Sequence, residues 1–411
     1  MLQYVVVTIV ITVIYLTKKI INTKKIVNNV QEKPINRLIP LNITVDQVAN
    51  YDDRPWRPFR WPYYQTMSIF RLDINHWLDM DKYYVHYIEQ KAKVFHEYGK
   101  DNLDWLPESE EACYELMETV VEHMLIRYPK LFTQLEPKVI RNEITGEILD
   151  MKLPLKQHPL IYVSKLAKED FYVVLQNPKD GLHYLVAAAV PFPGGGFSVS
   201  EILGQHLDVI HNLVPYYQQK LQKSMEKWFN KLPVNEPVER ATWNITWDHN
   251  LRLMEVYKIP KYLETGEIAL PDPKEFVVRI DRQSLRRLPK SKAIIFTNHP
   301  LLYSLDEMKD EPLVPSLIKK MLFEGPEDIL KYKNFPIFRN HIENYLQGLI
   351  DRQIELKLID ENTPIKTLPT YPFAHWVNTD FDYINGWNNP SQPKENKYNW
   401  LNKNKGYNEK N

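Results

Sequence analysis

The sequence RIDRQSLRRLPKSKAIIFT, residues 279–297, overlaps two stretches that have the composition of β-strands. Residues 275–282 and 292–297 contain Val, Ile and Phe, which favour extended structure. The first nine residues of the quoted sequence also contain four arginines: Arg279, Arg282, Arg286 and Arg287. The sequence therefore predicts a strongly basic β-element.

The two faces of this element can make different contacts. In an extended segment Arg279 and Asp281 share a face, whereas Arg282 leaves at the following turn. Arginines bordered by apolar strands can bind carboxylates bidentately. The alternative is a solvated turn in which Asp281 forms a surface ion pair. Composition alone leaves both interpretations open.

Composition and charge exclude several classes of protein. The 411 residues carry 52 basic and 52 acidic side chains, which argues against binding of nucleic acid through phosphate neutralisation. The single cysteine, Cys113, excludes an internal disulfide, a multi-cysteine zinc site and an iron–sulfur cluster. Length alone predicts about two to three domains, or one large decorated domain.

The amino-terminal residues predict a membrane anchor. Residues 2–16 are apolar and uncharged, and four lysines follow them: Lys18, Lys19, Lys24 and Lys25. Lysines on the carboxyl side of this run favour a cytosolic location for the rest of the chain. Residues 2–16 and the residues around them lack the features of a secretory signal. We therefore expect a single-pass anchor helix within residues 1–22, with residues 2–17 in the lipid bilayer of the endoplasmic reticulum or the mitochondrial outer membrane. The alternative is a buried strand or helix.

Periodicity divides the remaining chain into one main domain and two flanking segments. The segments are a connector, residues 23–60, and an Asn- and Lys-rich tail expected to be disordered, residues 377–411. The domain, residues 61–376, has three predicted parts: helices over about 66–133, a sheet-containing core over about 138–300 and helices over about 303–360, which are broken at Pro326 and Pro336. The predicted fold class is α+β.

The core contains two predicted hairpins and one helical stretch. A Thr-Gly turn at residues 145–146 separates the first pair of strands, and an Asn-Pro-Lys-Asp-Gly turn at residues 177–181 separates the second pair. Residues 199–232 are predicted to be helical with a break at Pro215. A further strand is predicted at residues 240–247.

The histidines of the sequence LGQHLDVIHNLVP, residues 203–215, allow two interpretations. His206 and His211 lie five residues apart, on different sides of a helix, so they are poor partners for one metal ion. A lone histidine at the end of an apolar turn is usually a hydrogen-bonded core residue. The alternative is a haem ligand, because haem iron needs a single imidazole on its proximal side and haem propionates need cations.

Four blocks, in order along the chain, resemble one family. They are YYQTMSIFRLD at residues 63–73, LGQHLDVIHNLVP at residues 203–215, RATWNI at residues 240–245 and RIDRQSLRRLP at residues 279–289. Together they resemble the haem-dependent oxidative N-demethylase-like family, called the HRQ family in yeasts. The resemblance extends over roughly residues 60–358.

This resemblance implies a fold, a cofactor and candidate site residues. The fold would be a PAS-like antiparallel sheet of about five strands with helices, and the cofactor would be haem b. Carried over by position, His211 would be the axial ligand of the iron. The other implied residues are Arg279, Arg282 and Arg286 as propionate or domain-anchoring partners, Gln283 beside them, and Trp243 as a pocket wall or a core residue.

The implied activity is that of an O₂-dependent monooxygenase or oxidative N-demethylase that acts on a small amine. The chain shows no flavin or nicotinamide fingerprint and lacks the cysteines of an iron–sulfur centre, so a separate reductase would supply electrons. A non-catalytic haem-binding or sensor protein with a PAS-like fold is the main alternative. A structural or interaction domain without haem is the third.

Overall fold

The computed structural model describes residues 37–253, 259–266 and 269–377. The chain divides into two compact units after Arg37, and every element named below belongs to the second unit, Leu38–Asn411.

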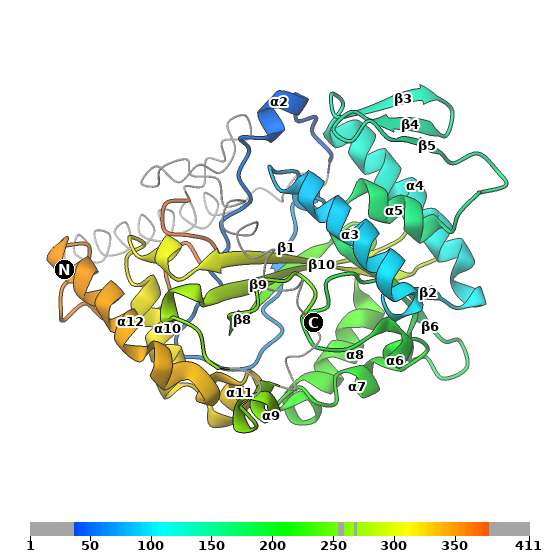
Figure 1. The fold of residues 1–411 in the computed structure, drawn as a ribbon. Coiled ribbons are helices and arrows are strands. Elements are labelled where there is room, and N and C mark those ends of the chain that lie inside the picture. Colours follow the sequence, from blue (N-terminus) through cyan, green and yellow to red (C-terminus); the bar gives the residue numbers. More distant parts are fainter. Residues whose placement is uncertain (1–36, 254–258, 267–268, 378–411) are drawn as a thin grey trace, which may run out of the picture. The chain divides into compact units, whose positions relative to one another are not determined.

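A seven-stranded antiparallel sheet is the centre of this unit (Figure 1). Its strand order is β1-β8-β9-β10-β6-β7-β2. In this order the strands are Phe70–Arg71, Val238–Thr246, Val277–Arg287, Ile294–Ser304, Asp170–Gln176, His183–Ala189 and Leu103–Trp105. The five inner strands correspond to strands predicted from the sequence. The short edge strands β1 and β2 lie in the part predicted to be helical, because two or three residues are too few to show a period.

The hairpin of β9 and β10 is the longest pairing in the sheet. Its register runs from Arg287 opposite Ile294 to Val277 opposite Ser304. Strand β10 continues well beyond the predicted end at residue 297 and passes through Pro300. Its pairing with β6 ends at Asn298, so no strand lies beside that edge of β10 at Pro300, where the Tyr87 hydroxyl donates to the proline carbonyl oxygen and no backbone donor is needed.

A second, three-stranded sheet stands apart from the first. Its order is β3-β4-β5, and its strands are Phe132–Glu136, Val139–Asn142 and Ile148–Asp150. Strands β4 and β5 are the first hairpin predicted from the sequence, and they flank the turn that contains Gly146 at φ 75°.

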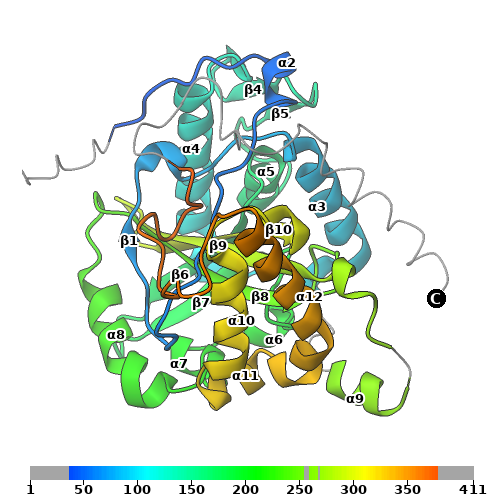
Figure 2. The same cartoon turned by 90° about the vertical axis from the view of Figure 1, so that its left-hand side faces the viewer.

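Two groups of helices pack on opposite faces of the large sheet (Figures 1 and 2). The first group is α3 (Tyr84–Tyr98), α4 (Glu110–Arg127) and α5 (Pro159–Leu166). The second is α6 (Val199–Ile202), α7 (Leu207–Ile210), a π-helical turn (Tyr217–Leu221) and α8 (Gln222–Lys231). Leu116 and Val163 of the first group share a core with Ile295, whereas Leu207 and Phe229 of the second share one with Leu285.

The carboxyl-terminal helices form a third layer against β8 and β9. They are α10 (Val314–Glu324), α11 (Glu327–Tyr332) and α12 (Phe335–Glu355), and Pro326 and Pro336 mark the breaks between them as predicted. Their apolar sides pack against Trp243 and Ile280. The remaining helices are short: α2 (Val45–Val48), α9 (Ile259–Glu264) and 3₁₀ turns at Ile74–His76, Gly99–Asp101, Pro107–Ser109, Pro273–Glu275 and Asp306–Met308.

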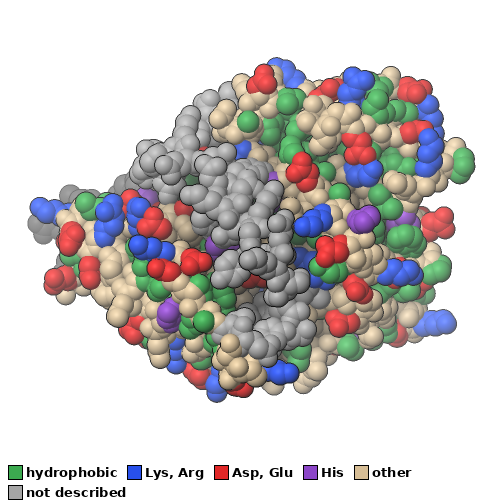
Figure 3. All heavy atoms as spheres, in the orientation of Figure 1, with side chains coloured by type: hydrophobic (Ala, Val, Ile, Leu, Met, Phe, Trp, Pro, Cys, Tyr) green, Lys and Arg blue, Asp and Glu red, His purple; other side chains and the backbone are tan. Residues whose placement is uncertain are grey.

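The segment rich in proline and aromatic residues near residues 55–62 lies along this third layer. Trp56 and Phe59 are fully buried, and their rings pack against Phe373 and Trp243 at centroid distances of 4.8 and 5.2 Å. On the face of the molecule in Figure 3, acidic and basic side chains are interspersed.

The predicted transmembrane anchor is corrected by the structure. Across the described residues, every helix is too short or too polar to cross a bilayer. The predicted anchor at residues 1–22 and the tail beyond residue 377 lie outside the described residues. The described fold is a mixed helix-and-sheet unit, and no helix in it supplies the expected anchor, from which the single-pass membrane location and the bilayer contact were inferred.

Candidate functional site

Arg279 is fully buried in β9, and protein groups satisfy its guanidinium group. Its Nε donates to Asp281 Oδ1 at 3.0 Å, and its Nη2 lies 2.9 Å from the same oxygen. Its other donors reach the carbonyl oxygens of Leu251 at 2.5 Å and Phe192 at 2.8 Å. Arg279 and Asp281 thus share a face of the strand as predicted, and Arg279 ties β9 to the segments that follow β7 and β8.

Arg282 projects from the opposite face of β9 into a buried group of charges. Its guanidinium donates to the carbonyl oxygen of His76 and to Glu239 Oε2, the latter at 3.2 Å. The same group lies 3.4 Å from Asp79 Oδ2. Arg54 also binds Glu239, at 3.0 Å. These contacts match the domain-anchoring interpretation of Arg282, because each of its partners belongs to the folded core.

Arg286 and Gln283 also lie on opposite faces. The Arg286 guanidinium lies 4.5 Å from the centroid of the Trp77 ring, on the face of Arg282. Gln283 lies on the face of Arg279, and its Nε2 is 3.5 Å from Asn298 Oδ1. The arginines that the sequence presents as one cluster are therefore divided between the two faces of the sheet.

Trp243 is a core residue between β8 and the carboxyl-terminal helices. It is 4% exposed, and its ring contacts those of Phe59, Tyr63 and Phe335 at centroid distances of 5.2, 5.9 and 5.3 Å. This environment matches the core-packing alternative.

His211 ends helix α7, and its ring has a defined tautomer. The Nδ1 atom lies 2.7 Å from the carbonyl oxygen of Leu207. A carbonyl oxygen only accepts, so Nδ1 carries the proton and Nε2 keeps its lone pair. Burial lowers the pKa of His211, and the positive charge of Arg240 adds to this effect. His211 is therefore a neutral imidazole, held in the way that metal-binding histidines commonly are.

Six side chains on the inner strands share one face and remain incompletely covered. We call them the inner-face patch: Tyr172, Arg240, Thr242, Asn244, Gln283 and Phe296. They share a face because Phe296 pairs with Tyr172 and Gln283 pairs with Arg240, while Asn298 links the two pairs. The same face of the sheet is covered by α6, α7 and α8 through Leu285. The helices therefore leave this part of the sheet less tightly covered than the core around it.

Arg240 is the charged member of the patch, and it lacks a counter-ion. Among the described residues no carboxylate pairs with its guanidinium, and its buried Nε has no hydrogen-bond partner. Burial lowers the pKa of Arg240 to about 10, although the group remains a cation at neutral pH. Buried cations normally have a partner, so this group is suited to an anionic ligand.

Lys333 adds a second cation beside the patch. It lies just before α12 and donates through Nζ to the carbonyl oxygen of Trp243. Burial lowers the pKa of Lys333 to about 8, an effect that Asp281 opposes and Arg240 reinforces. The electrostatic coupling to both residues places Lys333 near the patch. The Arg240 cation therefore lies on the side of the sheet that carries His211, and the Lys333 cation lies close enough to interact with it.

The structure brings together only part of the predicted site. His211, Arg279 and Gln283 lie on one side of the sheet, whereas Arg282 and Arg286 lie on the other. Sequence reasoning missed Arg240 and Lys333. Arg240 begins the block RATWNI, which was a usable signal, but nothing in the sequence around Lys333 distinguishes it from a surface lysine.

A comparison with protein families gives one match. The model of a family described as haem-dependent oxidative N-demethylase, alpha subunit-like, matches residues 68–343, which is more than half of the chain. The matched region contains the whole large sheet, α7 with His211, and the two cations Arg240 and Lys333.

Proposed function

The chain belongs to the haem-dependent oxidative N-demethylase, alpha subunit-like, family, and on that premise we propose that it binds haem b and uses O₂ to oxidise a small amine. The observation that carries the proposal is the His211 imidazole, whose Nδ1 donates to the carbonyl oxygen of Leu207, so that Nε2 carries the lone pair. The name of the family supports a haem-dependent oxidative enzyme. The substrate class and the reaction are our proposal.

The residues present fit a haem. His211 offers one imidazole nitrogen for the iron, and the carbonyl oxygen of Leu207 orients the ring. A haem carries two propionates, and two cations lie close to each other: Arg240, whose charge acts on His211, and Lys333, whose charge is coupled to that of Arg240. We therefore assign the propionate contacts to Arg240 and Lys333 in place of Arg279 and Arg282, because protein groups already occupy the latter two.

The haem, when bound, supplies the O₂ chemistry that oxidises the C–H bond beside an amine nitrogen. The chain itself would bind the haem, orient the amine and shield the site from water. His211 would bind the haem iron, and Arg240 and Lys333 would bind the propionates. Tyr172 and Phe296, whose rings are 5.1 Å apart, present an aromatic surface on the same face of the sheet. Electrons would come from a separate reductase.

An absorption spectrum of the full-length protein tests haem binding. After expression with haem supplementation we expect a Soret band that shifts on reduction and addition of CO. The variant His211→Ala should lose or alter these spectra. The exposed His96 on α3 provides the control, and His96→Ala should behave as wild type. Absence of a Soret band from the folded wild-type protein would contradict haem binding, and unchanged His211→Ala spectra would contradict the ligand assignment.

Turnover is tested separately. With a reductant and O₂, the haem-loaded protein should release formaldehyde from methylated small amines, and the His211→Ala variant should not. A protein that binds haem and CO but consumes no O₂ with any such amine would be a haem-binding or sensor protein, and the enzymatic part of the proposal would fail.

A further inference from the structure

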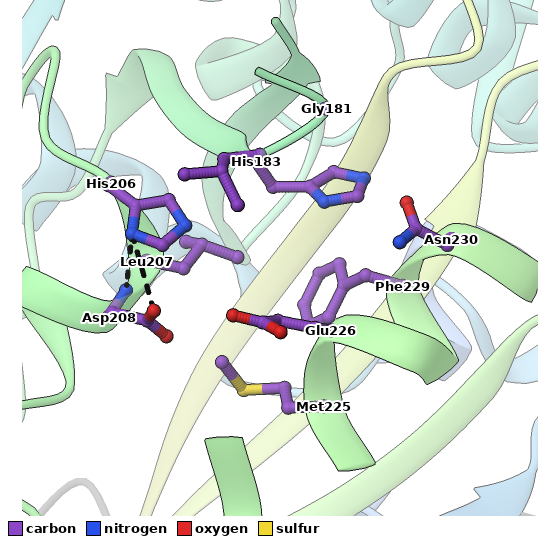
Figure 4. Close-up of a pocket in the computed structure, with 10 residues that line it drawn as sticks. Gly181, His183, His206, Leu207, Asp208, Met225, Glu226, Phe229 and Asn230 are labelled. Carbon is purple, nitrogen blue, oxygen red and sulfur yellow. Dashed lines mark hydrogen bonds and ion pairs between the residues drawn. The ribbon is translucent and has the colours of Figure 1, made fainter. Parts of the chain in front are cut away.

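A small pocket lies near the start of β7, between α7 and α8 (Figure 4). Its cavity volume is about 50 Å³, enough for an ion and a few waters. Three of its lining residues carry metal-binding groups: His206, Asp208 and Glu226. None of these residues belongs to the haem site proposed above.

The three groups are close enough to serve one ion. A ligand atom from each of His206, Asp208 and Glu226 lies within 4.8 Å of the other two. His206 Nδ1 lies 3.5 Å from Asp208 Oδ2 and accepts the backbone N–H of Asp208 at 3.4 Å, which leaves Nε2 as the other ring nitrogen for an ion. Bonds of about 2.0–2.1 Å at tetrahedral zinc place neighbouring ligand atoms about 3.3–3.4 Å apart. The pair at the start of α7 already has this spacing, and Glu226 approaches it from α8 (Figure 4).

Two neighbours fix the orientation of the Asp208 carboxylate. The Tyr217 hydroxyl donates to Oδ1 at 2.5 Å, and Gln222 Nε2 donates to Oδ2 at 2.7 Å. Carboxylates that bind metals are commonly held by such outer hydrogen bonds. Both neighbours come from the π-helical turn and the first residue of α8, so the fold positions Asp208 in advance of any ligand.

A second histidine provides an independent observation. His183, in β7, lines the same pocket and is 5% exposed. Its buried Nε2 has no hydrogen-bond partner within the described part of the chain. In Figure 4 its ring lies on the pocket wall between His206 and Asn230. An unsatisfied buried imidazole on the wall of the pocket that Asp208 and Glu226 also line indicates that a group is needed there to satisfy it.

We propose that His206, Asp208 and Glu226 bind a divalent transition metal ion of the zinc type. An imidazole with two carboxylates selects such ions over Mg²⁺ and Ca²⁺, which take oxygen ligands almost exclusively. Three protein ligands leave the fourth position open toward the pocket and His183. The sequence predicted that His206 and His211 are poor partners for one ion, and the structure instead brings His206 close to Asp208 on α7 and Glu226 on α8.

Metal retention by the full-length protein tests this site. After treatment with a chelator, the protein is loaded with Zn²⁺, dialysed and analysed by elemental mass spectrometry. We expect about one Zn²⁺ per chain, retained in excess Mg²⁺ and Ca²⁺. Loading with Co²⁺ should give visible absorption bands of a tetrahedral ion. The variant Glu226→Gln should weaken Zn²⁺ binding at least tenfold, and His206→Ala should do the same.

The matched control is Glu236→Gln, which removes an exposed carboxylate after α8 and should leave Zn²⁺ binding unchanged. Failure of the wild-type protein to retain Zn²⁺ would overturn the site without any variant. Equal affinity in the wild type, Glu226→Gln and His206→Ala, with circular dichroism showing that each is folded, would also overturn it. The Soret spectrum should not depend on Glu226, so this result and the haem result are distinguishable.

Discussion

Arg279 and Asp281 form an ion pair of 2.9 Å on one face of β9, where Arg279 has no exposed surface. Gly194 packs directly against this pair. A Cβ atom added at Gly194 would lie 2.7 Å from Asp281 Oδ2 and 3.2 Å from Arg279 Nη2. The triple-glycine sequence, residues 194–196, therefore has a packing role at the centre of the sheet and no phosphate-binding role is needed to explain Gly194.

The ion pair predicts a large loss of stability for Asp281→Ala. The change leaves the buried Arg279 cation without its carboxylate, and breaking a buried pair in this way costs about 3–5 kcal/mol. Urea unfolding followed by circular dichroism measures the difference. The exposed pair of Lys309 and Asp306 is the control, since Asp306→Asn should change the free energy of unfolding by less than about 1 kcal/mol. Equal effects of the two variants would contradict the structural role of Arg279.

Close packing predicts opposite outcomes for two glycine-to-alanine changes. Gly194→Ala should destabilise the protein by about 1–3 kcal/mol, because the new methyl group overlaps the ion pair. Gly348→Ala should stabilise it by about 0.5–1 kcal/mol, because Gly348 lies within α12 and a Cβ there meets no atom within 4 Å. Thermal unfolding of the two variants checks both signs. A stabilising Gly194→Ala would show that the contact with Asp281 is not as close as described.

The unpaired Arg240 predicts a ligand-dependent effect of Arg240→Gln. The change removes a charged hydrogen-bond donor from the proposed propionate site, and we expect the Kd for haem to rise about tenfold or more. The haem-free protein should be no less stable, because Arg240 has no carboxylate partner among the described residues. Arg71→Gln, at an exposed position on the edge strand, is the control. Unchanged haem affinity would remove Arg240 from the site.

Asp170 predicts a pH-dependent contribution to stability. Burial raises the pKa of Asp170 to about 8, against the opposing charges of Lys91 and Arg279. In the unfolded chain an aspartate has a pKa of about 3.9. Between these values the folded chain keeps a proton that the unfolded chain has lost, so this contribution to the free energy of unfolding falls as pH rises from about 4 to about 8.

The variant Asp170→Asn removes that proton equilibrium. Between about pH 4 and 8 the slope of its unfolding free energy against pH should be more positive than that of the wild type, by at most about 1.4 kcal/mol per pH unit. Denaturant titrations at several pH values measure the slope, and Asp46→Asn at an exposed position should retain the wild-type slope. An unchanged slope in Asp170→Asn would mean that Asp170 is ionised in the folded protein.

The sequence by itself determined the element types and the family. Alternation and turn residues predicted the five inner strands and both hairpins, and prolines predicted the breaks before α11 and α12, because these signals act within a few residues. The four quoted blocks predicted the family that matches residues 68–343. The predicted anchor at residues 1–22 rested on an uncharged run and the lysines after it, and no helix of the described residues is able to cross a bilayer.

Only the tertiary structure decided which side chains meet. The register of β9 divides the arginines between two faces, and a shift by one residue would exchange those faces. Arg240 and Lys333 lie far apart in the chain and converge because β8 and the start of α12 pack together. Likewise, Glu226 reaches His206 and Asp208 only because α8 folds back beside α7. Contacts of this kind depend on packing between segments that are distant in the sequence, so local sequence patterns do not predict them.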